Sequence, residues 1–183
     1  MSTRGAYGFR IDGRDKITYN HYDSYPGYLG VAVLRYATKT PVDKMIDVAR
    51  GIILVQETDR PTPQQIKECL PYYDGGVSEQ TVEDWYCLLH QAQGNLFVYN
   101  DGLKYMIDNH DFLGDSLFCE WAYVINLDEG LLEVYKGFQK ARTENRYAQF
   151  IDPTSSYANC RLIATYPLTA LPDETRFLAQ IAF

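Results

Sequence analysis

The chain has 183 residues, which is enough for one folded domain with a substantial hydrophobic core. Its composition, with 46% hydrophobic and 22% charged residues, is ordinary for a soluble globular protein. The formal net charge of −7 argues against direct nucleic-acid binding, because an acidic field repels the phosphate backbone.

The first predicted element is a β-hairpin over residues 3–23. Alternation in TRGAYGFRI places Tyr7, Phe9 and Ile11 on one face of a strand. Asp12-Gly13 supplies the residues that a tight turn with positive φ requires, and KITYNHYD forms the returning strand. The small residues of the first strand, Gly5 among them, favour the close approach of another element.

Four helices are predicted in the middle of the chain from apolar stripes at helical spacing and from their capping residues. They are residues 27–37, a helix from Thr40-Pro41 to Gly51, a helix from Thr62-Pro63 to Gly75, and a helix from Thr81, with Asp84 completing a capping box, to Gly94. We interpret the apolar stripes as core positions.

After residue 116 the hydrophobic period changes to two. In LFCEWAYVIN, Cys119, Trp121, Tyr123 and Ile125 are expected to share a face, and LLEVYKG is expected to pair with it. NCRLIATYPL predicts a further strand, and a last helix begins near Pro172. The segregated order indicates a single α+β domain over residues 1–183, with a mostly antiparallel sheet built from the N-terminal hairpin and the C-terminal strands.

The cysteines and histidines show no metal-ligand spacing. None of the four cysteines lies in a C-x-x-C pair, and we expect buried free thiols. The stretch NDGLKYMIDNHDFLGD contains an adjacent His-Asp pair, but the further ligands of a metal phosphohydrolase are missing, so a solvated acidic loop is expected. The sequence therefore predicts no metal and no cofactor.

No run of about 18 apolar residues occurs, and no positively charged start precedes an apolar stretch. The sequence accordingly predicts neither a membrane span nor a signal peptide. A reducing cytoplasm is the simplest compartment for a protein with these cysteines.

The amino terminus offers one arrangement with catalytic potential. Ser2 follows Met1, and a small second residue usually allows the initiator methionine to be removed. The free α-amine would then act as a general base for the Ser2 hydroxyl. Under this hypothesis the catalytic residues are Ser2, Asn20, His21 and Asp23, and Arg4 and Arg10 bind an anionic substrate.

The hairpin STRGAYGFRIDGRDKITYNHYD and the order of elements resemble the N-terminal-nucleophile hydrolases of the bile-salt and penicillin amidase type. The resemblance implies a layered αββα fold, cleavage of a C–N amide bond, Ser2 as nucleophile, and Asn20 and Asp23 as orienting or oxyanion groups. That subset favours cysteine at the position of Ser2, and its Asn-x-Asp motif is one residue shorter than the segment from Asn20 to Asp23.

The leading interpretation is a protein that binds another macromolecule without turnover, such as an inhibitor or regulatory protein of a phage or mobile element. The chain has 16 tyrosines, and exposed aromatic residues are enriched at interface cores. The predicted surface is the cluster of Tyr19, Tyr22, Tyr25 and Tyr28, whose alternative role is to close the core above the hairpin. An acidic chain would suit a protein partner with a basic surface, and no membrane contact is expected.

Overall fold

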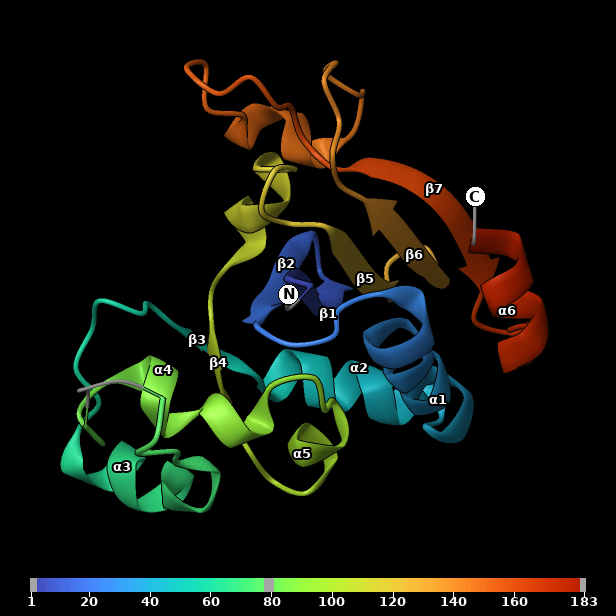
Figure 1. The fold of residues 1–183 in the computed structure, drawn as a ribbon. Helices are drawn as coiled ribbons and strands as arrows, with labels where there is room; N and C mark the ends of the chain where they lie inside the picture. The colour runs from blue at the N-terminus through green and yellow to red at the C-terminus, as the bar shows by residue number, and fades with distance from the viewer. Residues whose placement is uncertain (1–2, 78–80, 182–183) are drawn as a thin grey trace.

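In the computed structural model, which describes residues 3–77 and 81–181, a five-stranded sheet forms the centre of the molecule (Figure 1). The strand order is β2-β1-β5-β6-β7, in which β1 and β5 are parallel and the other neighbours are antiparallel. The strands are β1 (Gly5–Ile11), β2 (Arg14–Asn20), β5 (Trp121–Asn126), β6 (Leu131–Lys136) and β7 (Arg161–Pro167). The predicted α+β class, with a sheet from the N-terminal hairpin and the C-terminal strands, is confirmed.

Helices and helical turns fill the connections between the strands. The α-helices are α1 (Val31–Lys39), α2 (Val42–Gly51), α3 (Pro63–Cys69), α4 (Trp85–Leu88), α5 (Phe97–Asn100) and α6 (Glu174–Ile181). The shorter turns are a π-helical turn η1 (Pro26–Gly30) and the 3₁₀ turns η2 (Leu70–Tyr72), η3 (His90–Ala92), η4 (His110–Gly114) and η5 (Arg146–Phe150). Within the described ranges, no helix has both the length and the apolar character needed to cross a membrane.

The N-terminal hairpin forms as its sequence predicts. Asp12 and Gly13 both have positive φ, 52° and 73°, which is the geometry that a two-residue turn between twisted strands requires. The Asp128 carboxylate accepts hydrogen bonds from both turn amides, at 2.7 and 2.9 Å. The turn after β5 therefore holds the turn after β1, at the same end of the sheet.

Both faces of the three middle strands, β1, β5 and β6, are buried, whereas the edge strand β7 is largely exposed. Tyr7 and Phe9 of β1 belong to the larger core, against α1, α2 and α6, whereas Ala6 belongs to a second, smaller core. Leu132 and Val134 pair with Ile125 and Tyr123 in the larger core, as predicted.

The prediction for Cys119 was wrong. This residue precedes β5 and packs in the smaller core with Ala122 and Val124, on the face opposite Tyr123. The alternation did not reveal this because the strand begins only at Trp121 and both of its faces are apolar. All four cysteines are buried free thiols, as expected.

Two of the predicted helix caps differ from expectation. Thr62 and Gln65 form the predicted capping box of α3. Thr40 does not cap α2, because no side chain caps this helix and the Thr40 hydroxyl accepts a hydrogen bond from Asn100. The fourth helix begins at Trp85, later than predicted, and Asp84 is its N-cap, accepting hydrogen bonds from the amides of Tyr86 and Cys87.

A second, two-stranded parallel sheet was not predicted. It consists of β3 (Ile53–Val55) and β4 (Tyr105–Ile107). The main-chain amide of Asn109, just after β4, donates to the Ile17 carbonyl of β2 at 2.8 Å. This small sheet therefore connects the lobe that contains α3 and α4 to the edge of the main sheet (Figure 1).

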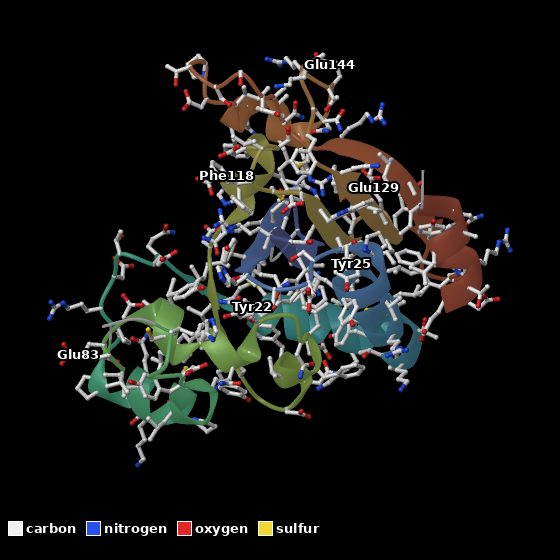
Figure 2. The ribbon with its side chains drawn as sticks, in the orientation of Figure 1. Tyr22, Tyr25, Glu83, Phe118, Glu129 and Glu144 are labelled. Carbon is white, nitrogen blue, oxygen red and sulfur yellow. The ribbon has the colours of Figure 1, made fainter. Side chains whose placement is uncertain are left out.

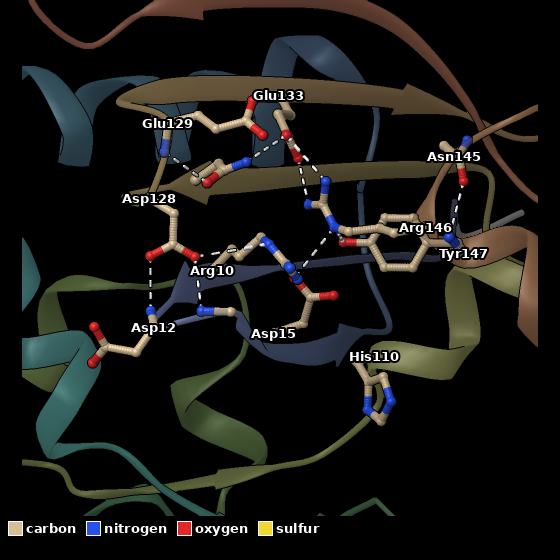
Figure 3. A network of polar contacts seen from close by, with 12 residues as sticks. Arg10, Asp12, Asp15, His110, Asp128, Glu129, Glu133, Asn145, Arg146 and Tyr147 are labelled. Carbon is tan, nitrogen blue, oxygen red and sulfur yellow. Dashed lines mark hydrogen bonds and ion pairs between the residues drawn. The ribbon is translucent and has the colours of Figure 1, made fainter.

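A buried ion-pair network crosses one end of the main sheet (Figure 3). The Arg146 guanidinium donates to both carboxylate oxygens of Glu133, at 3.1 and 2.5 Å. Its Nε lies 3.4 Å from Oδ1 of Asp15 on β2. The Glu133 side chain is only 4% exposed, and it also accepts hydrogen bonds from Asn126 and Tyr135. The network thus fastens η5 across β2 and β6 and keeps the second face of the sheet covered.

Removing Glu133 should destabilise the fold strongly. Glu133→Ala leaves the partly buried Arg146 guanidinium without its main partner, and breaking such a buried pair typically costs about 3–5 kcal/mol. Urea unfolding followed by circular dichroism measures the change. Glu144→Ala, at an ion pair whose glutamate side chain is 89% exposed, is the matched control and should leave the midpoint unchanged. Equal midpoints for the two variants would contradict a stabilising role of the network.

Candidate functional site

Exposed tyrosines gather in the segment that follows β2. Tyr22, Tyr25 and Tyr28 are 52%, 37% and 58% exposed, whereas Tyr19 is half-buried. The exposed fractions favour the surface role over the alternative in which these rings close the core. In Figure 2, Tyr22 and Tyr25 lie near the centre of the view, between the lobe of α3–α5 and α1.

A groove of about 440 Å³ opens beside these tyrosines. Its wall is formed by Tyr22, Asp23 and Tyr28, together with Arg35 of α1 and Glu174 of α6. Arg35 and Glu174 form a bidentate pair, at 2.5 and 2.8 Å. Asp23 has no ion-pair partner among the described residues, so its carboxylate gives this wall an uncompensated negative charge.

The turn that carries the tyrosines is held firmly from inside. The buried Ser24 donates its amide to the Thr3 carbonyl at 3.0 Å, and the Tyr123 hydroxyl donates to the Ser24 carbonyl at 3.1 Å. A β-carbon on Gly5 would lie 2.6 Å from the β-carbon of Ser24 and 2.4 Å from the Trp121 carbonyl oxygen. Two elements therefore pack closely against the first strand, as predicted. They are this turn and β5.

The predicted catalytic residues lie partly together. Ser2 is outside the described residues. Asn20 pairs with Gly5 across the hairpin, and its side-chain amide donates to the Ser24 hydroxyl at 2.9 Å and to the Tyr22 carbonyl. Asn20 and Asp23 both line the groove. The structure thus brings Asn20 and Asp23 to the end of the sheet where β1 starts.

His21 faces Tyr19. The ring nitrogen Nδ1 of His21 lies 2.8 Å from the Tyr19 hydroxyl, and its backbone amide donates to Gln93. Burial lowers the pKa of His21, and the nearby charges of Arg4 and His90 add to this effect.

The two predicted substrate-binding arginines lie at opposite ends of β1. Arg4 is exposed near the start of the strand, with its guanidinium 5.6 Å from the centre of the Phe118 ring. Arg10 is near the other end, with its guanidinium 3.2 Å from Asp15 and 3.9 Å from Asp128. Arg4 therefore lies near Asn20, while Arg10 belongs to the ion-pair network of Figure 3.

Tyr19 lines a second, enclosed cavity of about 20 Å³. Its ring centre lies 6.4 Å from that of Tyr86, which follows the cap of α4. Glu57 also lines the cavity, from the turn that follows β3, and burial together with the Asp84 charge raises the pKa of Glu57. Burial likewise raises the pKa of Tyr19 and Tyr86.

The predicted acidic loop contains one close pair of titratable groups. His110 and Asp108 form a pair at 2.7 Å. In the parts of the chain that the structure describes, no three His, Cys, Asp or Glu side chains are grouped so as to hold a metal ion.

Sequence reasoning missed Glu57 and Tyr86 as members of a site, and also Arg35 and Glu174. Arg35 and Glu174 are 139 positions apart, and no sequence pattern connects them. Glu57 follows a strand of three residues, which is too short to give a clear alternation.

Comparisons with protein-family models, with curated proteins and with solved structures find no significant match to this chain. The interpretation of the site therefore depends on its geometry and chemistry.

Replacing Gly5 should disturb the site and the sheet together. Gly5→Ala forces the Ser24 turn or the β5 backbone to move, and overpacking of this kind costs about 1–3 kcal/mol. Thermal unfolding measures the loss. Gly51→Ala is the control, because a β-carbon there meets nothing within 4 Å, and it should not lower the stability. A Gly5→Ala protein as stable as the Gly51→Ala protein would show that the contact is not tight.

Proposed function

We propose that the protein acts by binding another protein, and that its interaction surface is formed by Tyr22, Tyr25 and Tyr28 beside the groove. The main support is the exposure of the three tyrosine rings, two of which, Tyr22 and Tyr28, line the groove. Tyrosine provides a large amphipathic contact area at a low cost in conformational entropy, and aromatic residues are enriched at interface cores. We call these three residues the tyrosine surface.

The rigidity of the turn adds to this support. The Tyr28 amide donates to the Tyr25 carbonyl at 3.0 Å, and the Leu29 amide donates to the Asp23 carbonyl at 3.2 Å. The rings of Tyr25 and Tyr28 contact each other edge to face, with centres 4.8 Å apart. A surface that is already ordered loses little entropy when a partner binds.

The charge of the surface favours a basic partner. The chain carries 24 acidic and 17 basic residues, and Asp23 contributes an unpaired carboxylate to the groove. A lysine or arginine beside Asp23 would also lie near tyrosine rings, and such cation–π contacts are favourable. Complementary charge would increase the association rate and disfavour acidic proteins. An inhibitor or regulatory protein of a phage or mobile element would fit this type of binding.

The tyrosine surface can be tested by cross-linking and mutation. A photoreactive p-benzoylphenylalanine at position 28 should cross-link a partner that the same group at position 70 does not, since Leu70 is also exposed but lies after α3, in the other lobe. For the partner so identified, Tyr25→Ala/Tyr28→Ala should weaken binding by about 30-fold, as loss of a hot spot does.

The matched control is Ile53→Ala/Leu70→Ala, which removes two side chains that are 48% and 52% exposed. It should bind with the affinity of the unchanged protein in calorimetry. Equal binding by the tyrosine double variant would show that the surface is wrongly assigned.

An alternative function is an amidohydrolase with Ser2 as nucleophile. Its support is local: the Thr3 carbonyl accepts from Ser24, and Asn20 is the partner of Gly5 in the hairpin. Asn20 and Asp23 line a groove at this end of the strand. In this role Asn20 and Asp23 would orient the substrate or the oxyanion, and His21 would belong to the same catalytic set.

Ser2→Ala tests this alternative. The intact mass of the untagged protein first shows whether Met1 is removed, because a retained methionine blocks the α-amine. If Met1 is absent, hydrolysis of an amide substrate should fall to background in Ser2→Ala. Ser24→Ala is the control for the neighbouring hydroxyl and should retain turnover in proportion to its folded fraction. Hydrolysis that persists in Ser2→Ala would contradict a nucleophilic role.

A further inference from the structure

The cavity beside Tyr19 is bordered by an exposed carboxylate without a counter-ion. Glu57 forms no ion pair within the described part of the chain, and none of the residues lining the cavity is basic. Its walls include the aromatic side chains of Tyr19, Tyr86 and Tyr99. A carboxylate among tyrosine rings is a chemical environment that favours a cation, through charge and cation–π attraction.

The size of the cavity selects the kind of cation. A volume of about 20 Å³ has room for one water-sized group. A lysine ammonium is a compact point charge of about this size with three donors, whereas a planar guanidinium or a trimethylated ammonium is larger. One oxygen acceptor is present besides Glu57, because the Thr18 hydroxyl lines the same cavity and uses only its hydrogen, which it donates to Asn109.

An acidic groove adjoins the cavity. Glu57 lines both, and the groove, with a volume of about 570 Å³, also contains Asp59, Glu83 and Asp84. Its basic residue, Arg60, lies 3.4 Å from Glu83 in an exposed pair. Figure 2 places Glu83 at the outer margin of the lobe that contains α3 and α4, and Glu57 is the residue that the groove and the cavity share. The groove would accommodate the methylene chain of a lysine and the positively charged residues that flank this lysine in the partner.

We propose that the cavity between Tyr19, Tyr86 and Glu57 is a recognition pocket for the primary ammonium group of a lysine in a basic protein segment. Assigning the lysine to the partner rests on the proposed function, whereas the affinity of the pocket for a primary ammonium does not. The Glu57 carboxylate pairs with the ammonium, the tyrosine rings enclose it, and the acidic groove binds the flanking basic residues.

The pocket can be tested with butylammonium, which reproduces the lysine side chain. Titration at neutral pH, followed by the NMR amide signals of Tyr86 and Asn109, should give saturable shifts below about 100 mM, a concentration that corresponds to weak binding by a single charged group. Butyltrimethylammonium should bind at least tenfold more weakly because of its size, and 1-butanol should bind at least tenfold more weakly because it is neutral.

Glu57→Gln keeps the shape of the side chain and should weaken butylammonium binding by about tenfold, as expected for loss of a charged hydrogen-bond partner. Glu83→Gln removes the same charge from the outer groove and should change the affinity by less than about twofold, because Glu83 does not line the cavity and its distant charge is screened. Tyr25→Ala/Tyr28→Ala should bind butylammonium normally, so this experiment and the cross-linking experiment can fail separately.

Three results would overturn the proposal that this cavity is a recognition pocket. The absence of saturable shifts would mean that the cavity holds only water. Equal or tighter binding of butyltrimethylammonium would contradict the size argument. Equal losses in Glu57→Gln and Glu83→Gln would mean that the general acidic field, and not the cavity, attracts the cation.

Discussion

The arrangement of the whole domain depends on the burial of both faces of the central sheet, which the Arg146–Glu133 ion pair makes possible at one end. Glu133 lies on β6 in the smaller core, where an unpaired carboxylate would be strongly unfavourable. Arg146 neutralises it and brings η5 over the sheet, while the larger core is left for α1, α2 and α6. The strands can therefore be apolar on both sides, because η5 covers one face and the helices cover the other.

In this arrangement the two ends of β1 have different surroundings. Arg10 is fixed within the ion-pair network, and Asp128 holds the turn that follows this strand. At the other end, the absence of a side chain on Gly5 allows the Ser24 turn to pack directly on the strand. The residues at the network end thus stabilise the fold. The Gly5 end carries an ordered turn with exposed rings, and it is the end where we propose that the partner binds.

Sequence reasoning predicted the elements that local chemistry determines. The Asp12-Gly13 turn and the Thr62 capping box formed as expected, because their residues make bonds within a few positions. The sequence also led to the tyrosines at 22, 25 and 28, although burial had to be seen to distinguish a surface from a core. Cys119 was misplaced because a strand buried on both faces has no polar side to set its phase.

The remaining features depend on contacts between distant segments. The groove needs Arg35 and Glu174 from the first and last α-helices, and the cavity needs Glu57, Tyr86 and Tyr19 from three elements. Loop lengths and helix packing bring these groups together, and neither produces a sequence motif with fixed spacing. A single sequence can thus indicate which residue types form such a site, but not which individual residues do.

The groove and the cavity are linked by a continuous set of ring contacts. Tyr22 lies 6.0 Å from His90, His90 lies 5.3 Å from Tyr86, and Tyr86 lies 6.4 Å from Tyr19, all between ring centres. The buried His90 has Nδ1 3.3 Å from Asp74, and its Nε2 has no hydrogen-bond partner in the described structure. A buried ring nitrogen without a partner is unfavourable, and it lies beneath the surface between the two sites. An extended basic segment crossing Tyr22 would meet an exposed carboxylate at each end of this set of rings, Asp23 in the groove and Glu57 at the cavity, so a single segment could engage both sites.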